Sequence, residues 1–119
     1  MKIGIIGSRR FLNKTSIKNT IDKLPNNSVI VSGGAKGPDL WAEKAAQSRN
    51  LKTMIFLPNL PPKNSPKHEF TKAYYERNRK IAEHSDIIHA FIAIDRKGGT
   101  EYTINYAKKL GKPIVIHTS

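Results

Sequence analysis

The stretch Val29-Ile30-Val31-Ser32-Gly33-Gly34-Ala35-Lys36-Gly37-Pro38-Asp39 decides the fold of this chain. A β-branched run typical of a buried strand leads into a glycine-rich corner that can turn tightly. Pro38 and Asp39 then indicate a helix start, because proline costs no hydrogen bond there and an acidic side chain suits the helix dipole. A strand, glycine loop and helix start present free backbone N–H groups, which predicts an anionic or nucleotide ligand. The alternative is a plain tight turn between strand and helix.

The composition indicates one domain with a strong positive charge. The chain has 119 residues and no cysteine, which excludes thiol catalysis, disulfides and Cys-ligated zinc. No apolar run approaches the roughly 18 residues of a membrane helix, so we expect a cytoplasmic protein with no membrane partner. The net charge of +12 favours nucleic acid, nucleotides or phosphorylated metabolites as partners. A lysine-rich solvated surface is the alternative explanation of that charge.

Hydrophobic periodicity alternates between strand and helix along the whole chain. We expect strands at residues 2–6, 28–32, 52–57, 86–94 and 113–117, and helices at 16–24, 38–49, 68–84 and from the loop at 95–100 to residue 110. The proline-rich loop at 58–66 is either a lid over the site or a passive connector. The βαβαβαβαβ order predicts a three-layer α/β fold, a Rossmann-like doubly wound parallel sheet of five strands in the order 3-2-1-4-5. The strand at 86–94 is expected to be covered on both faces.

Three glycine-bearing loops are expected to meet where the strand order reverses, at the carboxyl ends of the strands. Besides residues 32–39, these loops carry Gly7, Ser8 and Arg9, and Gly98, Gly99 and Thr100. Asp39 would repel a phosphate on its own helix end, so we expect it to face a ribose and the phosphate to lie at the other two loops. For Asp39 the alternative is a role in capping its helix and complementing the dipole.

The third helix carries a charge on its apolar stripe. Phe70, Tyr74, Arg77 and Ile81 have the spacing of one helix face, which directs the Arg77 guanidinium toward the sheet. A lone buried guanidinium is costly, so Arg77 is expected to contact a ligand, with Asn78 beside it. The alternative is that Arg77 reaches the rim or pairs with a carboxylate, for which Asp39, Asp86 and Glu101 are the candidates.

Other catalytic signatures are missing from the sequence. The four histidines have no metal-ligand spacing, so no metal site is predicted, and His89 is expected to be packed or hydrogen-bonded in its strand. Neither a P-loop nor the dinucleotide fingerprint nor a serine-nucleophile motif occurs, and no cofactor is predicted.

The order of four motifs resembles that seen in the Smf/DprA–LOG (SLOG) Rossmann-like superfamily. The motifs are Gly7-Ser8-Arg9, residues 32–39, Arg77-Asn78 and Gly98-Gly99-Thr100. The chain is most similar to its small stand-alone YspA-like branch, and the likeness covers residues 1–119. The resemblance implies a single SLOG-type nucleotide-binding domain, and a homo-oligomer, because relatives are often dimers or larger. It also implies these ligand-binding residues: Gly7, Ser8, Arg9, Ser32, Gly33, Gly34, Ala35, Gly37, Asp39, Arg77, Asn78, Gly98, Gly99 and Thr100.

The LOG branch of the superfamily consists of phosphoribohydrolases, which cleave the base from a nucleoside monophosphate. The resemblance places Arg77 at the position of their helix arginine. However, Tyr102 and Thr103 stand where that branch has paired glutamates. Asp39 and Glu101 are therefore the candidate catalytic carboxylates if this chain hydrolyses an N-glycosidic bond.

The DprA branch binds single-stranded DNA and loads a recombinase. Sequence-tolerant DNA binding needs aromatic platforms beside a basic groove, and Phe70, Tyr74 and Tyr75 are near, although two of them fit the buried core by pattern. Our first expectation is a nucleotide or nucleotide-derived ligand, such as an ADP-ribose-like molecule, bound for sensing, sequestration or hydrolysis. The alternative is a DprA-like single-stranded-DNA-binding protein.

Overall fold

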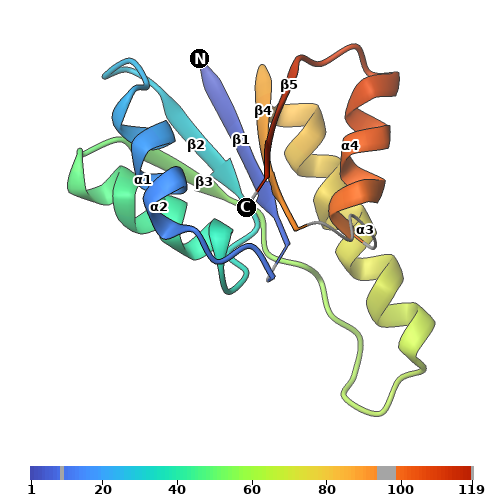
Figure 1. Ribbon diagram of the computed structural model, residues 1–119. Helices are drawn as coiled ribbons and strands as arrows, with labels where there is room; N and C mark the ends of the chain where they lie inside the picture. The colour runs from blue at the N-terminus through green and yellow to red at the C-terminus, as the bar shows by residue number, and fades with distance from the viewer. Residues whose placement is uncertain (9, 94–98, 119) are drawn as a thin grey trace.

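The computed structural model describes residues 1–8, 10–93 and 99–118, and a parallel sheet of five strands lies at its centre (Figure 1). The elements are β1 (Lys2–Gly7), α1 (Lys14–Asp22), β2 (Val29–Ser32), α2 (Pro38–Ser48), β3 (Lys52–Ile55), α3 (Lys67–His84), β4 (Ile87–Ile92), α4 (Gly99–Lys109) and β5 (Ile114–Thr118). The strand order is β3-β2-β1-β4-β5 and every pairing is parallel. The predicted three-layer α/β fold and its strand order are confirmed.

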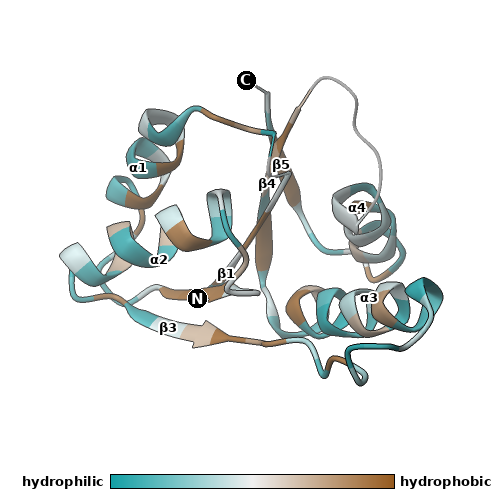
Figure 2. Cartoon of the chain, turned by 90° about the horizontal axis from the view of Figure 1, so that it is seen from below, coloured by the Kyte–Doolittle hydropathy of each residue, from teal (hydrophilic) through white to brown (hydrophobic). Residues whose placement is uncertain are grey.

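Two helices cover each face of the sheet, and each face has its own apolar core. On one face, Ile17 of α1 and Ala42 of α2 pack with Ile3, Ile5 and Ile30 of the strands. On the other face, the core joins α3 and α4 to the opposite side of β1, β2 and β4. Figure 2 shows the apolar strands between helices whose outer surfaces are hydrophilic. Burial of β-branched residues on both faces explains why β1 and β2 are continuous apolar runs.

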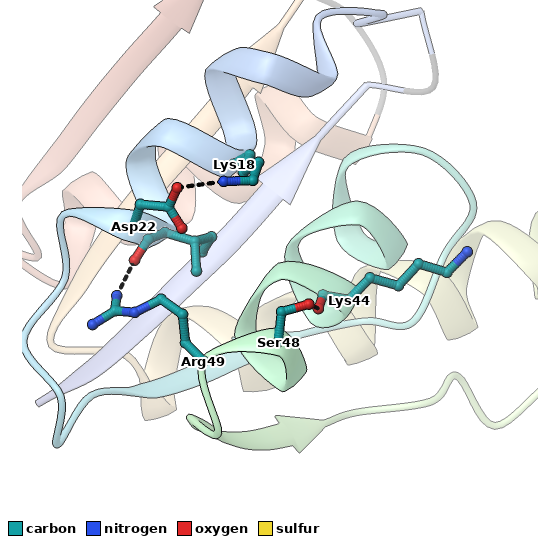
Figure 3. A network of polar contacts seen from close by, with 6 residues as sticks. Lys18, Asp22, Lys44, Ser48 and Arg49 are labelled. Atoms are coloured by element: carbon teal, nitrogen blue, oxygen red, sulfur yellow. Dashed lines mark hydrogen bonds and ion pairs between the residues drawn. The ribbon is translucent and has the colours of Figure 1, made fainter.

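The helix ends follow local backbone preferences. Asn50, just after α2, has a φ of 56°, and Gly111, after α4, has a φ of 74°. These left-handed residues end their helices. Figure 3 shows how Arg49, at the end of α2, reaches across to α1: its guanidinium donates to the backbone carbonyls of Ile21 and Leu24. This contact fixes α1 against α2 without an ion pair between the helices.

One expectation about buried surfaces is wrong. Tyr74 is 36% exposed and Phe70 is only partly buried, because the first half of α3 extends beyond the edge of the sheet, where no layer covers its stripe (Figure 1). The buried face of α4 consists of Thr103, Ile104 and Ala107.

The expectation that β4 is covered on both faces is confirmed for most of the strand: Phe91 is buried on the face next to α1, and Ile88, Ala90 and Ile92 are buried on the other. His89, on the face of β4 next to α1, is only half-buried. Its Nδ1 lies 2.9 Å from Nε2 of His117 on β5, and both histidines line a cavity of about 500 Å³ beside α1. His89 is hydrogen-bonded, as the sequence predicts.

Candidate functional site

A cleft of about 720 Å³ lies at the carboxyl ends of β1 and β2. This position follows from the topology, because the chain runs from β1 to β2 on one side and β4 pairs with β1 on the other. The volume is within the roughly 300–1,000 Å³ typical of ligand sites. The lining residues come from both sides of the sheet: Ile6, Gly7, Ser8, Gly33, Gly34, Ala35, Lys36, Asp39, Leu57, Pro58, Thr71, Tyr74, Tyr75, Arg77, Asn78, Ile81, Gly99, Thr100 and Thr103.

Asp39 shapes the glycine loop that follows β2. Its Oδ2 accepts hydrogen bonds from the backbone N–H groups of Gly33, at 3.2 Å, and Ala35, at 3.3 Å. Gly34 and Gly37 have φ values of 68° and 93°, which only glycine adopts without strain, so the loop can fold back onto the carboxylate. Burial raises the pKa of Asp39 to about 6, and the two N–H donors and the charge of Arg77 oppose that rise.

Arg77 reaches from α3 to the same loop. Its Nη1 donates to the carbonyl oxygen of Gly33 at 2.7 Å, and its Nε donates to Oδ1 of Asn78 at 2.8 Å. A side chain on Gly33 would overlap the guanidinium, so the close approach requires glycine. The guanidinium also lies 5.7 Å from the ring centre of Tyr74. Burial lowers the pKa of Arg77, but the group remains a cation because a guanidinium does not lose its proton in proteins.

The loop after β1 forms the opposite wall of the cleft. The backbone N–H of Ser8 donates to the carbonyl of Phe91 at 3.0 Å, and the Ser8 hydroxyl accepts from the N–H of Arg10 at 3.1 Å. A Cβ on Gly7 would overlap Pro38, so this glycine lets the first turn of α2 approach β1. The loop is therefore held by backbone contacts on both sides.

The first turn of α4 closes the cleft on its third side. Gly99 and Thr100 line the cleft, and a Cβ on Gly99 would lie 3.2 Å from Nδ2 of Asn78. The N-terminal N–H groups of a helix favour anions. The arrangement therefore combines a fixed guanidinium, the start of a helix and a buried carboxylate around one space.

Most of the predicted site residues lie together in this cleft. Those that line it are Gly7, Ser8, Gly33, Gly34, Ala35, Asp39, Arg77, Asn78, Gly99 and Thr100. Ser32 and Gly37 do not line it: the buried Ser32 hydroxyl donates to Oε1 of Glu43, and Gly37 is the N-cap of α2. Glu101 lies in the first turn of α4 outside the lining residues. Arg9 and Gly98 fall outside the described residues.

The sequence placed Tyr74 and Tyr75 near the site but did not identify Leu57 as part of its wall. Leu57 and Pro58 follow β3, and Tyr74 and Tyr75 lie on α3. Leu57 is 72% exposed, although a leucine at the end of a strand is usually taken for core. The position of Leu57 in the sequence could have indicated its role, because the end of β3 lies on the same sheet edge as the glycine loops. The start of the proline-rich loop therefore belongs to the wall of the cleft.

Neither a membrane span nor a metal cluster occurs in the described ranges. None of the helices there is both long enough and apolar enough to cross a membrane. Three or more metal-binding side chains do not gather anywhere within residues 1–8, 10–93 and 99–118.

Comparison with known proteins identifies similar sequences and folds. Residues 1–72 match the model of the family described as DNA recombination-mediator protein A. The fold is similar to DNA processing protein A (DprA) from Streptococcus pneumoniae, with a TM-score of 0.77 and 24% sequence identity over 97% of this chain. The match spans 49% of the S. pneumoniae protein, about half its length. No curated protein sequence matches this chain significantly.

A second similar structure is the C-terminal domain of a hydrogenase from Pyrococcus furiosus, with a TM-score of 0.50 and 15% identity. The match covers 98% of this chain and 90% of that domain. At these identities the structural likenesses show the fold alone.

Proposed function

The chain belongs to the DNA recombination-mediator protein A family, and from this premise we propose that it binds single-stranded DNA in the cleft. The family name concerns DNA recombination, and the similar S. pneumoniae protein is named for DNA processing. The strong positive charge of the chain, +12, suits a polyanion.

One observation carries the proposal: a fixed cation and an exposed apolar wall face the same cleft. Arg77 is held by Gly33 and Asn78, so its position is set before a ligand arrives. Leu57 and Tyr74 on the wall are 72% and 36% exposed and offer surfaces to unpaired bases. A backbone phosphate at a cation with a base on an aromatic or apolar surface is the usual chemistry of sequence-tolerant single-strand binding.

In this proposal each wall has a separate role. Arg77 pairs with a phosphate, and the backbone N–H groups at the start of α4 take part in holding it. Asp39 keeps the glycine loop in its shape and contributes no contact to the phosphate, since both are anionic. Gly33 provides the space for the guanidinium.

The test is fluorescence anisotropy of labelled oligonucleotides with the full chain. We expect an oligo-dT single strand to bind in the micromolar range or tighter and a duplex of equal length to bind more weakly. The logarithm of the association constant should fall linearly with the logarithm of salt concentration, by about 0.7 for each phosphate contact. A folded protein that binds neither strand at low salt contradicts the proposal.

A second candidate function is binding of a nucleotide-derived small molecule, and Asp39 is the observation that favours it. A carboxylate in the cleft wall can accept hydrogen bonds from ribose hydroxyls, which a cleft for phosphates alone would not need. In this second proposal the ligand is a nucleoside monophosphate or an ADP-ribose-like molecule. Calorimetry with a panel of such ligands distinguishes the two, because the second proposal predicts saturable binding without a steep dependence on salt.

Catalysis belongs to this second proposal only. Asp39 would stabilise a cationic sugar or orient water during N-glycosidic hydrolysis. Glu101 is the weaker partner for that reaction, since it does not line the cleft within the described part of the chain. Release of free base from a nucleoside monophosphate, lost in an Asp39→Asn variant, is the expected result if the chain is such an enzyme.

The glycine loops and the Arg77-Asn78 pair also support a finer assignment within the superfamily. We propose that residues 1–119 act as one domain of the SLOG superfamily, close to its YspA-like branch, and that the ligand residues are those of the cleft together with Arg9, Ser32, Gly37 and Gly98. We also propose a homo-oligomer. Size-exclusion chromatography with light scattering tests the oligomeric state.

A further inference from the structure

Three parallel tyrosine rings lie along the seam between α3 and α4. The ring centres of Tyr75 and Tyr102 are 4.1 Å apart, with planes inclined by 6°. The ring centres of Tyr102 and Tyr106 are 6.4 Å apart, with planes inclined by 7°. All three side chains are half-buried, and they lie outside the buried core of α4. The helices α3 and α4 pack side by side (Figure 1), and the two ring contacts arrange the three tyrosines in one column along their seam.

One end of this column opens into the cleft. Tyr75 lines the cleft on α3, next to the turn that carries Arg77, and it stacks on Tyr102 of α4. A base that enters the cleft at Tyr75 therefore meets a ring that is already held parallel to a second ring. Such a prearranged pair loses little side-chain freedom when a base stacks on it.

Charge distinguishes the two ends of the column. Lys72 and Arg79 lie three residues before and four residues after Tyr75, so they share its face of α3. Nη1 of Arg79 donates to the hydroxyl of Tyr102 at 3.0 Å, which fixes a guanidinium beside the stacked pair. At the other end, the hydroxyl of Tyr106 donates to Oε2 of Glu83 at 2.6 Å. Glu76 also lies near Arg79, so the phosphate contact at the cleft end is assigned to the Arg79 guanidinium itself, whereas the charged partner at the Tyr106 end is the carboxylate of Glu83.

We propose that the DNA strand leaves the cleft over this seam, with a base stacked on the cleft side of Tyr75, whose ring is backed by Tyr102, and a phosphate paired with Arg79. The path stops before Tyr106, where Glu83 repels the backbone. This inference rests on the proposed DNA binding in the cleft and adds a second contact region to it. Stacking on tyrosine also explains how a short cleft could bind a longer strand without reading its sequence.

The first experiment compares two leucine variants of the same column by anisotropy with an oligo-dT strand. Tyr75→Leu removes the ring at the cleft, and we expect affinity to fall roughly tenfold, as for loss of one stacked base. Tyr106→Leu removes a ring of the same column at its acidic end and should change affinity less than twofold. Thermal melts of both variants show whether each is folded during the titration.

The second experiment places a reporter in the column. In a Trp41→Phe, Tyr75→Trp variant the only tryptophan stands at the cleft, and oligo-dT should quench its emission in a saturable way. The unchanged protein is the control, since Trp41 lies on α2 outside the cleft lining and its emission should not change.

The outcomes separate this inference from the proposed function. Quenching at position 75, with loss of affinity in Tyr75→Leu, supports the path. DNA binding by the unchanged protein without quenching at position 75, or with full affinity in a folded Tyr75→Leu variant, overturns the path and leaves the cleft proposal standing. If Tyr75→Leu does not fold, the quenching experiment decides. No DNA binding by the unchanged protein overturns both proposals.

Discussion

The cleft and the face of β4 next to α1 each hold a pair of ionisable side chains. In the cleft, Asp39 and Arg77 carry opposite charges and share the glycine loop as a partner. On the face of β4, His89 and His117 meet through ring nitrogens 2.9 Å apart, so one ring must donate and the other accept. Burial raises the pKa of Asp39 to about 6 and lowers the pKa of His89 to about 4.

The charge states of the two pairs show which of the two regions suits an anion. Desolvation disfavours the charged form of every group, but Arg77 keeps its charge because guanidinium is so strongly basic. The histidine pair becomes neutral near pH 7, since the pKa of each ring is lowered. The two cavities therefore differ in their ionisable groups: the cleft holds the guanidinium of Arg77, fixed by its hydrogen bonds, whereas the second cavity holds the neutral histidine pair and Lys23.

The largest expected effect comes from a side chain on the glycine that carries the guanidinium. In Gly33→Ala the new Cβ overlaps Arg77, so the guanidinium must move, and we expect DNA affinity to fall at least tenfold in anisotropy titrations. The matched control is Gly111→Ala, whose Cβ meets open space but whose φ of 74° makes the substitution strained. That variant should lose about 1 kcal/mol of stability and keep its DNA affinity. Equal affinity in the two variants would contradict the role of Arg77.

Asp39→Asn should change how stability depends on pH. The pKa of Asp39 rises from 3.8 unfolded to about 6 folded, so its contribution to stability is fully present below about pH 4 and is lost as pH rises through 6. The loss corresponds to about 3 kcal/mol. In urea unfolding at pH 4 to 7 the asparagine variant should lack this decline, while its amide oxygen still accepts the loop hydrogen bonds. The same slope in both proteins would show that Asp39 titrates normally.

His89→Leu should change the slope in the opposite direction. The pKa of His89 falls from 6.5 unfolded to about 4 folded, mainly through burial and then through the neighbouring His117, so stability is present above pH 6.5 and is lost as pH falls toward 4. The leucine variant should resist acid better than the unchanged protein. Its DNA affinity at pH 7 should be unchanged, and a clear loss would link the β4 face to binding.

The fold and the charged residues of the site, Asp39 and Arg77, could be predicted from the sequence. Alternating strand and helix patterns leave few arrangements once crossovers are right-handed, so the strand order could be predicted. The spacing from Phe70 to Ile81 correctly predicted that Arg77 faces the sheet. Arg77 lies in the second half of α3, close to the buried Ile81. The glycine loops lie close together because they follow neighbouring parallel strands at the same edge of the sheet, and this holds for any ligand.

The aromatic half of the site could not be predicted in the same way. Periodicity shows which residues share a helix face, but not how far a helix extends past the sheet, and Tyr74 is exposed for that reason. The stacking of Tyr75 on Tyr102 depends on the relative placement of two helices, which neither helix encodes alone. His89 is half-buried because it lines the second cavity beside α1, and a cavity of this kind leaves no mark on the strand pattern.

The central claim is that Arg77 binds the DNA backbone in the cleft, and one comparison tests it most directly. Arg77→Ala and Lys44→Ala each remove one positive charge, and Lys44 lies on the surface of α2 outside the cleft lining (Figure 3). With oligo-dT at several salt concentrations, we expect Arg77→Ala to bind at least tenfold more weakly and with a salt slope smaller by about 0.7, and Lys44→Ala to bind as the unchanged protein does. Equal losses in two folded variants would mean that overall charge, and not the cleft, holds the DNA.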